Sequence, residues 1–214
     1  MKRAWIVQGG WKGHQPEEVA EILKGLLEEA GMAVSVFGHL DCFCDETALA
    51  AVDLIVPVWT MGAISPEQLR PLLAAVSGGA GCAGLHGGMA DAFRDQTEYQ
   101  YMVGGQWVAH PGGDGVAYRV RVTDLSDPVM TGVDDFAVAS EQYYMHVDPG
   151  NRVLAVTDFG STEMPVVWKK AYGRGRVFYC SLGHSADVVR MPEVSGIMRR
   201  GMAWAARDLT ATRR

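Results

Sequence analysis

Cysteine is scarce in this chain of 214 residues, and its four cysteines do not have the spacing of a zinc knuckle or a redox motif. We therefore expect Cys42, Cys44, Cys82 and Cys180 to be reduced thiols, which is typical of a cytoplasmic protein. Cys82 and Cys180 lie in apolar, strand-like segments and are expected to be buried. A small scaffold held together by disulfides is excluded.

Basic clusters and long apolar runs are also missing. Lys and Arg number 19 against 25 Asp and Glu, so the formal net charge is −6. A mildly acidic chain without a Lys/Arg cluster is a poor partner for nucleic acid or for an anionic membrane. No apolar run approaches the roughly 18–20 residues that span a bilayer, and the first apolar run is too short for a signal-peptide core. The glycine-rich segments match neither G-x-G-x-x-G nor a P-loop, which leaves no case for nucleotide binding.

The segments that are present alternate as in an α/β domain. Apolar residues make up 48% of the chain, which is normal for a protein with a hydrophobic core. The first half predicts strands and helices in alternation, with strands at 3–8, 33–37, 54–59 and 80–85 and helices at 16–30 and from 66 onward. The second half predicts a short helix at 97–102, strands at 116–122, 136–140, 153–158, 166–172 and 176–181, and a last helix at 192–206. We expect one domain over residues 1–214, with a flavodoxin-like, doubly wound, mainly parallel sheet and an antiparallel extension in the C-terminal half.

Three of the six histidines follow predicted strands. His14 comes after the first strand, His86 ends the fourth, and His184 follows the last. If these strands are neighbours, the three imidazoles project from one rim of the sheet. Such a group suits acid–base chemistry, or it holds a divalent metal such as Zn, Mn, Co or Ni. The alternative is that these are solvated loop histidines.

The fourth predicted strand ends in a turn that resembles a nucleophile elbow. The segment Gly84-Leu85-His86-Gly87-Gly88 has the small neighbours that let one side chain stand up in a strained turn. That side chain is His86, where nucleophilic enzymes have Ser or Cys. Covalent amide chemistry therefore loses its attacking atom, and proton transfer, substrate binding or metal ligation is favoured.

A second cluster combines a carboxylate, two phenols and an imidazole in the six residues from Glu141 to His146. Aromatic rings beside a carboxylate are typical of a sugar site. We expect the substrate-binding residues to be Trp11, His14, Trp59, His110, Tyr143 and His146. His110 and His146 are expected in loops. The alternative for the aromatic residues is packing in the core.

Together these motifs resemble the trehalose-utilisation (ThuA-like) family, whose fold is similar to that of class I glutamine amidotransferases. The resemblance runs from Trp5 to Asp208. The residues that carry it are Gly9-Gly10 with His14 and the segments 84–87, 103–111, 141–143, 165–177 and 182–184. It implies that His86 stands in the place of the amidotransferase cysteine, so that glutaminase activity is absent. It also implies that His184 matches the catalytic histidine of the amidotransferases, with Asp187 near the position of its carboxylate partner but at a different spacing.

The family resemblance implies a role in sugar catabolism and a functional link to sugar oxidoreductases that make 3-keto glycosides. The expected activity is isomerisation, enolisation or cleavage of a glycoside or 3-keto sugar, with His86, His184 and Glu141 as acid–base residues. A metal-dependent variant would use His14, His86 and His184 as ligands. The alternative function is a non-catalytic domain that binds a sugar or a protein partner, and the methionine-rich loops leave a homo-oligomer open.

Overall fold

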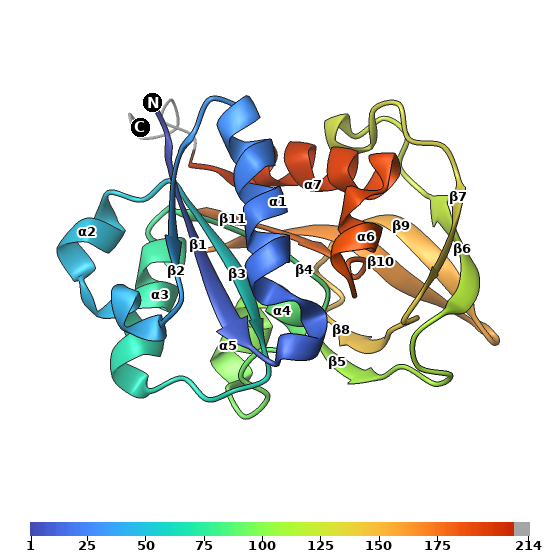
Figure 1. The fold of residues 1–214 in the computed structure, drawn as a ribbon, viewed down its shortest axis with the longest axis horizontal. Coiled ribbons are helices and arrows are strands. Elements are labelled where there is room, and N and C mark those ends of the chain that lie inside the picture. The colour runs from blue at the N-terminus through green and yellow to red at the C-terminus, as the bar shows by residue number, and fades with distance from the viewer. Residues whose placement is uncertain (208–214) are drawn as a thin grey trace.

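A nine-stranded sheet forms the centre of the computed structural model, which describes residues 1–207 (Figure 1). The end of the expected domain, residues 208–214, lies outside the described part. The strand order across the sheet is β2-β1-β3-β4-β11-β10-β9-β6-β7. The strands are β1 (Arg3–Gly10), β2 (Ala33–Phe37), β3 (Leu54–Thr60), β4 (Gly81–Leu85), β6 (Val116–Val122), β7 (Phe136–Ser140), β9 (Arg152–Phe159), β10 (Thr162–Tyr172) and β11 (Gly175–Cys180).

The first five strands of this order are parallel and form the flavodoxin-like part of the fold. The β3 strand shows why the sequence specifies a central strand here, since six of its seven residues are buried and it has no alternating polar face. Because all five strands point the same way, their carboxyl ends meet at one edge of the sheet. The predicted fold class is confirmed.

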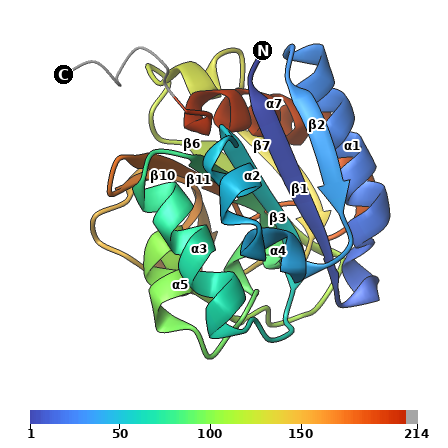
Figure 2. The same cartoon turned by 90° about the vertical axis from the view of Figure 1, so that its left-hand side faces the viewer.

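Helices cover both faces of the parallel strands, and Figure 2 shows α1 and α3 on opposite sides of them. The helices α1, α6 and α7 pack together on one face, and α2, α3 and α5 lie on the other. The α-helices are α1 (Pro16–Glu29), α2 (Glu46–Ala50), α3 (Pro66–Ser77), α4 (His86–Ala90), α5 (Thr97–Val103), α6 (Ala186–Arg190) and α7 (Pro192–Ala205). Short 3-10 helices occur at η1 (Lys12–His14), η2 (Leu40–Cys44) and η3 (Pro128–Met130).

The two long helices of the first half begin and end at the residues that favour these positions. Pro16 is the first residue of α1, and Gly31 follows the helix at φ +78°, which favours glycine. At the start of α3, the side chain of Gln68 accepts a hydrogen bond from the Ser65 backbone at 2.9 Å, as in a capping box. Local sequence therefore fixes both helices.

The second half adds four antiparallel strands to the parallel sheet, as predicted. One expectation is wrong. The segment that carries His146 is a strand, β8 (Tyr144–Val147), which pairs antiparallel with β5 (Gly105–Ala109) in a separate two-stranded sheet. Both strands are short: β5 mixes glycine, amide and aromatic residues, and β8 has only four residues, so neither sequence shows a clear alternation.

The sheet separates two hydrophobic cores. One contains Leu23 and Ile197 from the α1 and α7 side, and the other contains Leu72 and Trp168 from the α3 side. All four cysteines are free, and Cys82 and Cys180 are fully buried, as expected.

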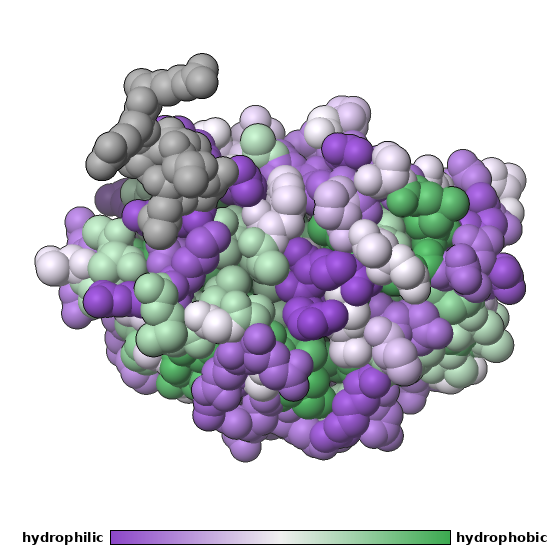
Figure 3. All heavy atoms as spheres, turned by 90° about the horizontal axis from the view of Figure 1, so that it is seen from above, coloured by the Kyte–Doolittle hydropathy of each residue, from purple (hydrophilic) through white to green (hydrophobic). Residues whose placement is uncertain are grey.

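The surface seen from above mixes hydrophilic residues with smaller apolar areas (Figure 3). Among residues 1–207, no helix has both the length and the apolar character that crossing a membrane requires.

Candidate functional site

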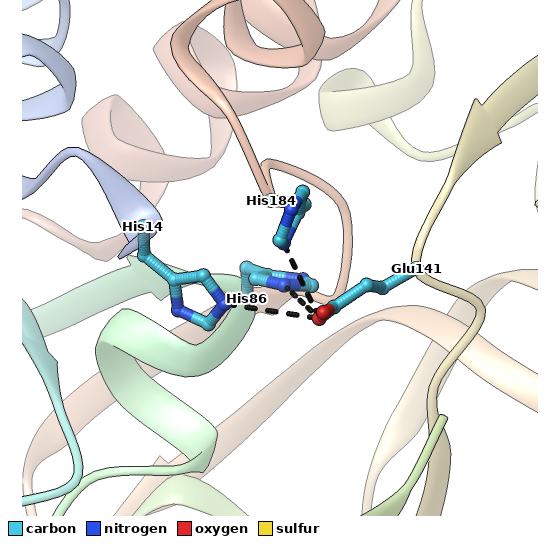
Figure 4. A group of neighbouring side chains, drawn as sticks. All are labelled: His14, His86, Glu141 and His184. Atoms are coloured by element: carbon cyan, nitrogen blue, oxygen red, sulfur yellow. Dashed lines mark hydrogen bonds and ion pairs between the residues drawn. The ribbon is translucent and has the colours of Figure 1, made fainter. Parts of the chain in front are cut away.

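Four side chains from distant parts of the chain converge at the carboxyl ends of the parallel strands (Figure 4). His14 ends η1, directly after β1; His86 is the first residue of α4, directly after β4. His184 follows β11, and Glu141 follows β7. One ligand atom from each residue lies within 4.8 Å of the others. We call these residues the histidine–glutamate cluster.

A single carboxylate oxygen is the centre of the cluster. Oε2 of Glu141 lies 3.1 Å from Nε2 of His86, 3.3 Å from Nδ1 of His184 and 3.7 Å from Nε2 of His14. The other oxygen, Oε1, lies 3.7 Å from Nδ1 of His110. The side chains of His14, His86 and Glu141 are each at most 8% exposed, and His184 is 13% exposed, so the interaction takes place away from bulk water.

The backbone around each member explains its orientation. His86 adopts φ +45°, a left-handed conformation that costs a non-glycine residue of order 1–3 kcal/mol. Gly87 then leaves room for His14, because a Cβ at residue 87 would lie 2.7 Å from the imidazole of His14. The loop that carries Glu141 is held by a hydrogen bond from the Tyr118 hydroxyl to the Glu141 carbonyl at 3.1 Å.

The hydrogen bond of His86 to the backbone fixes the position of its proton. Nδ1 of His86 lies 2.8 Å from the carbonyl oxygen of Ser181, which can only accept, so Nδ1 carries the hydrogen. Nε2 of the neutral ring then carries a lone pair, which faces the carboxylate of Glu141. Two acceptors at this distance repel each other, and a cation between them turns this repulsion into attraction.

The pKa values favour the deprotonated form of this pair. Burial lowers the pKa of His86 to about 4, so its ring is neutral at pH 7. Burial acts to raise the pKa of Glu141, but the contacts with His14, His184 and His86 outweigh it and hold this pKa well below its usual range. The contact with Glu141 raises the pKa of His184. A neutral His86 beside an ionised Glu141 is the protonation state that metal ligation requires.

The donor set fits a divalent transition metal. Among residues 1–207, the buried nitrogens Nε2 of His14 and Nδ1 of His184 lack a hydrogen-bond partner of good geometry. Three imidazole nitrogens and one carboxylate oxygen are ligands for Zn²⁺ and for related ions. Ligand atoms about 2.0–2.2 Å from one ion lie roughly 3–4.4 Å apart, so the cluster needs only a small contraction to hold it.

Hydrogen bonds outside the cluster orient two of these rings. Nδ1 of His14 lies 2.8 Å from the hydroxyl of Thr60, and Nδ1 of His86 is bonded to the Ser181 carbonyl. Such outer partners are typical of metal-ligating histidines. The sequence analysis missed Thr60 and Ser181. The sequence could have indicated Thr60. It is the last residue of the buried strand β3, which pairs with β1, and His14 follows β1.

Three more of the expected site residues lie against the cluster. Tyr143 stacks on His86 with ring centroids 4.0 Å apart, and Trp11 contacts the ring of His14 edge-on at 4.7 Å. Burial raises the pKa of Tyr143 well above its usual value, so this phenol stays protonated. Trp11 is 46% exposed, so its ring is available to a ligand beside the cluster. His110 faces Glu141 and is also half-exposed.

Other candidate residues lie elsewhere. His146 is exposed in β8, where its Nδ1 faces the side-chain amide of Gln106 at 3.4 Å, because the strand alternation turns Met145 inward instead. The ring of Trp59 lies against Gly9 and Gly62 and packs beside the α3-side core. The side chain of Asp187 is 94% exposed and pairs with Arg190, so the structure does not place it beside His184.

The fold and the cluster define a flavodoxin-like α/β protein with a histidine–carboxylate site at the carboxyl ends of its strands. Residues 3–205 match the ThuA family, described as Trehalose utilisation. The chain belongs to this family. The family is implicated in sugar catabolism, and the resemblance inferred from the motifs is confirmed.

Solved structures show the same fold at low sequence identity. A ThuA-like protein from Parabacteroides merdae has a TM-score of 0.78 at 20% identity, over 95% of this chain and 89% of that chain. A ThuA-like protein from Bacteroides uniformis has a TM-score of 0.79 at 14% identity, over 95% and 91%. A cytoplasmic protein from Salmonella typhimurium has a TM-score of 0.72 at 13% identity, over 97% and 100%. No curated protein matches the chain.

Proposed function

We propose that this protein is an enzyme of sugar catabolism that acts on a keto sugar or a glycoside, and that its histidine–glutamate cluster holds a divalent metal ion. The observation that carries the proposal is the convergence of three imidazole nitrogens on one oxygen of Glu141, with His86 as a neutral acceptor. The family description supports the substrate class. A cytoplasmic location is part of the proposal, supported by the four free cysteines and by the cytoplasmic relative from Salmonella.

The chemistry follows from what each residue offers. A divalent ion in such a site polarises a carbonyl or hydroxyl oxygen of the substrate and stabilises the negative charge that forms there. His14, His86, His184 and Glu141 would hold the ion, with their outer hydrogen bonds fixing the rings. A nitrogen that holds the ion has no lone pair left for a proton, so these residues would not act as the base in the metal-bound form.

His110 is the residue left to move the proton. Its Nδ1 has no hydrogen-bond partner of good geometry within the described part of the chain and faces Oε1 of Glu141, and its side chain is 34% exposed. It therefore reaches both the cluster and the solvent side, where a substrate would enter. Abstraction of a proton next to a ketone needs a base within hydrogen-bond reach of that proton. In the metal-free alternative, His86, His184 and Glu141 carry the acid–base steps themselves.

The first test is elemental analysis of tag-free protein together with turnover of a 3-keto disaccharide. We expect about one Zn, Mn, Co or Ni per chain, loss of turnover with a chelator and recovery when the metal is restored. His86→Asn, which tolerates the left-handed backbone, is expected to lose at least a hundredfold in turnover. His146→Asn is the matched control, because this histidine lies outside the cluster.

The outcomes separate the alternatives. Full activity of metal-free protein would contradict the metal site but would still support an enzymatic function. Sugar binding without turnover, unchanged in His86→Asn, contradicts the enzyme and favours the non-catalytic binding domain. A His110→Gln variant that keeps its metal but loses kcat assigns the proton transfer to His110.

A further inference from the structure

A glycine-rich loop between β5 and β6 lies against the histidine–glutamate cluster from the outside. The segment from His110 to Gly115 contains three glycines with positive φ values, and the Gly113 amide donates to the His110 carbonyl at 3.0 Å. The loop thus starts at the imidazole that faces Oε1 of Glu141. It also brings a carboxylate, Asp114, to the other side of the cluster.

The carboxylate of Asp114 is oriented by its own backbone and points at His184. Oδ1 of Asp114 accepts a hydrogen bond from the Gly115 amide at 2.8 Å. Oδ2 lies 3.8 Å from Nε2 of His184. Nδ1 of the same imidazole lies 3.3 Å from Glu141, so the His184 ring is placed between two carboxylates.

This arrangement selects one tautomer of His184. A neutral imidazole that directs a lone pair from Nδ1 into the cluster must carry its hydrogen on Nε2. A carboxylate beside Nε2 stabilises that hydrogen and raises the basicity of the nitrogen on the opposite side. The 3.8 Å separation exceeds the length of a hydrogen bond, so the loop must close by roughly 1 Å to form it.

We propose that Asp114 is the positioning residue of His184 and that closure of the loop 110–115 completes the site. The inference rests on the proposed metal site, which it deepens by naming an outer partner for the third imidazole. His14 and His86 have theirs in Thr60 and Ser181. Asp114 is 66% exposed but faces His184, whereas Asp187, the carboxylate nearest in sequence, pairs with Arg190 instead.

The test compares two carboxylate variants of the full chain after removal of metal with a chelator. We expect Asp114→Ala to weaken the binding of Co²⁺, followed by its visible absorption, by about 10–100-fold. Asp187→Ala is the matched control and is expected to bind within about twofold of the wild type. Equal affinity of wild type and Asp114→Ala overturns the inference.

A second readout does not depend on metal. Nitrogen-15 NMR of histidine-labelled, metal-free protein at about pH 9, where imidazoles are neutral, reports the tautomer of each ring. We expect Asp114→Ala to shift the His184 population toward the tautomer with its hydrogen on Nδ1, which faces Glu141 at 3.3 Å. A wild type that binds no Co²⁺ contradicts the metal site alone, whereas a His184 tautomer unaffected by Asp114→Ala contradicts the role of Asp114.

Discussion

His86 combines a strained backbone with a fully buried ring, and both properties follow from its place in the β4–α4 turn. Its φ of +45° is unusual for a side chain with a Cβ, and its ring is stacked on Tyr143. The Tyr179 hydroxyl donates a hydrogen bond to the His86 carbonyl at 3.0 Å, and the His86 ring donates one to the Ser181 carbonyl. The surrounding structure therefore stabilises a conformation that the residue itself does not prefer. This is the pattern expected where strain serves a functional site.

The low pKa of His86 predicts a pH dependence of stability for the metal-free protein. Burial lowers this pKa from 6.5 to about 4, so the unfolded chain binds a proton between these values that the folded chain does not bind. The free energy of unfolding is therefore expected to fall by up to about 3 kcal/mol as the pH drops from 6.5 to 4. Urea denaturation at several pH values, with chelator present, measures this loss.

His86→Asn is the comparison for this prediction, because asparagine does not titrate and tolerates the left-handed conformation. The variant is expected to show a smaller loss of stability between pH 6.5 and 4 than the wild type. The raised pKa of His184 acts in another window: its contribution is fully present below about pH 6.5 and is lost as the pH rises. Parallel stability curves for the wild type and the variant would refute the assignment to His86.

At the scale of the elements, the packing of a helix against the sheet decides which residues it tolerates. Gly25 and Gly201 are both helical glycines, in α1 and α7, yet their surroundings differ. A Cβ at residue 25 would meet nothing within 4 Å, whereas a Cβ at residue 201 would lie 2.3 Å from the ring of Phe178. The close approach of α7 to β11 therefore requires glycine at one of these positions and not at the other.

Two alanine substitutions test this difference. Gly25→Ala is expected to stabilise the protein by about 0.5–1 kcal/mol, because alanine is the better helix former and loses less entropy on folding. Gly201→Ala is expected to destabilise it by roughly 1–3 kcal/mol through overpacking against Phe178. Denaturant midpoints of the two variants give both values. Effects of equal sign would contradict the packing of α7.

At the scale of the whole molecule, the cluster joins the two halves of the chain. His14 and His86 follow parallel strands of the first half, and Glu141 and His184 follow strands of the second half. The ligands lie on segments that are far apart in sequence, so an ion bound to all four would hold the folded chain together. Such a site is present only in the folded state, and ligand binding then stabilises the native protein.

Metal is therefore expected to raise the melting temperature of the chelator-treated protein. At an ion concentration about 100-fold above Kd, the free energy of unfolding rises by about 2.7 kcal/mol. For a chain of this size this corresponds to roughly 5–10 °C in Tm. Calorimetry with and without Zn²⁺ measures the shift, and His14→Asn, which removes one ligand, is expected to reduce it. An unchanged Tm in the wild type would contradict a shared metal site.

The sequence by itself determined most of the elements and the family. The continuous apolar run of β3, the capping residues of α1 and α3 and the alternating strands of the second half are local patterns, so they were predicted close to their observed bounds. The short strands β5 and β8 were not predicted, because each forms only through pairing with the other. His14, His86 and His184 could be predicted to share an edge, since parallel strands end on the same side.

The tertiary structure alone decided how the site is assembled. Glu141 was predicted as a site residue, but only the return of the chain after β7 places its carboxylate among the imidazoles. In the same way, only the structure shows that His146 faces outward. It also shows that Asp114, rather than Asp187, lies beside His184. The physical reason is that a side chain's partner depends on distances set by packing across the whole sheet. Spacing along the chain carries that information only within one turn or one strand.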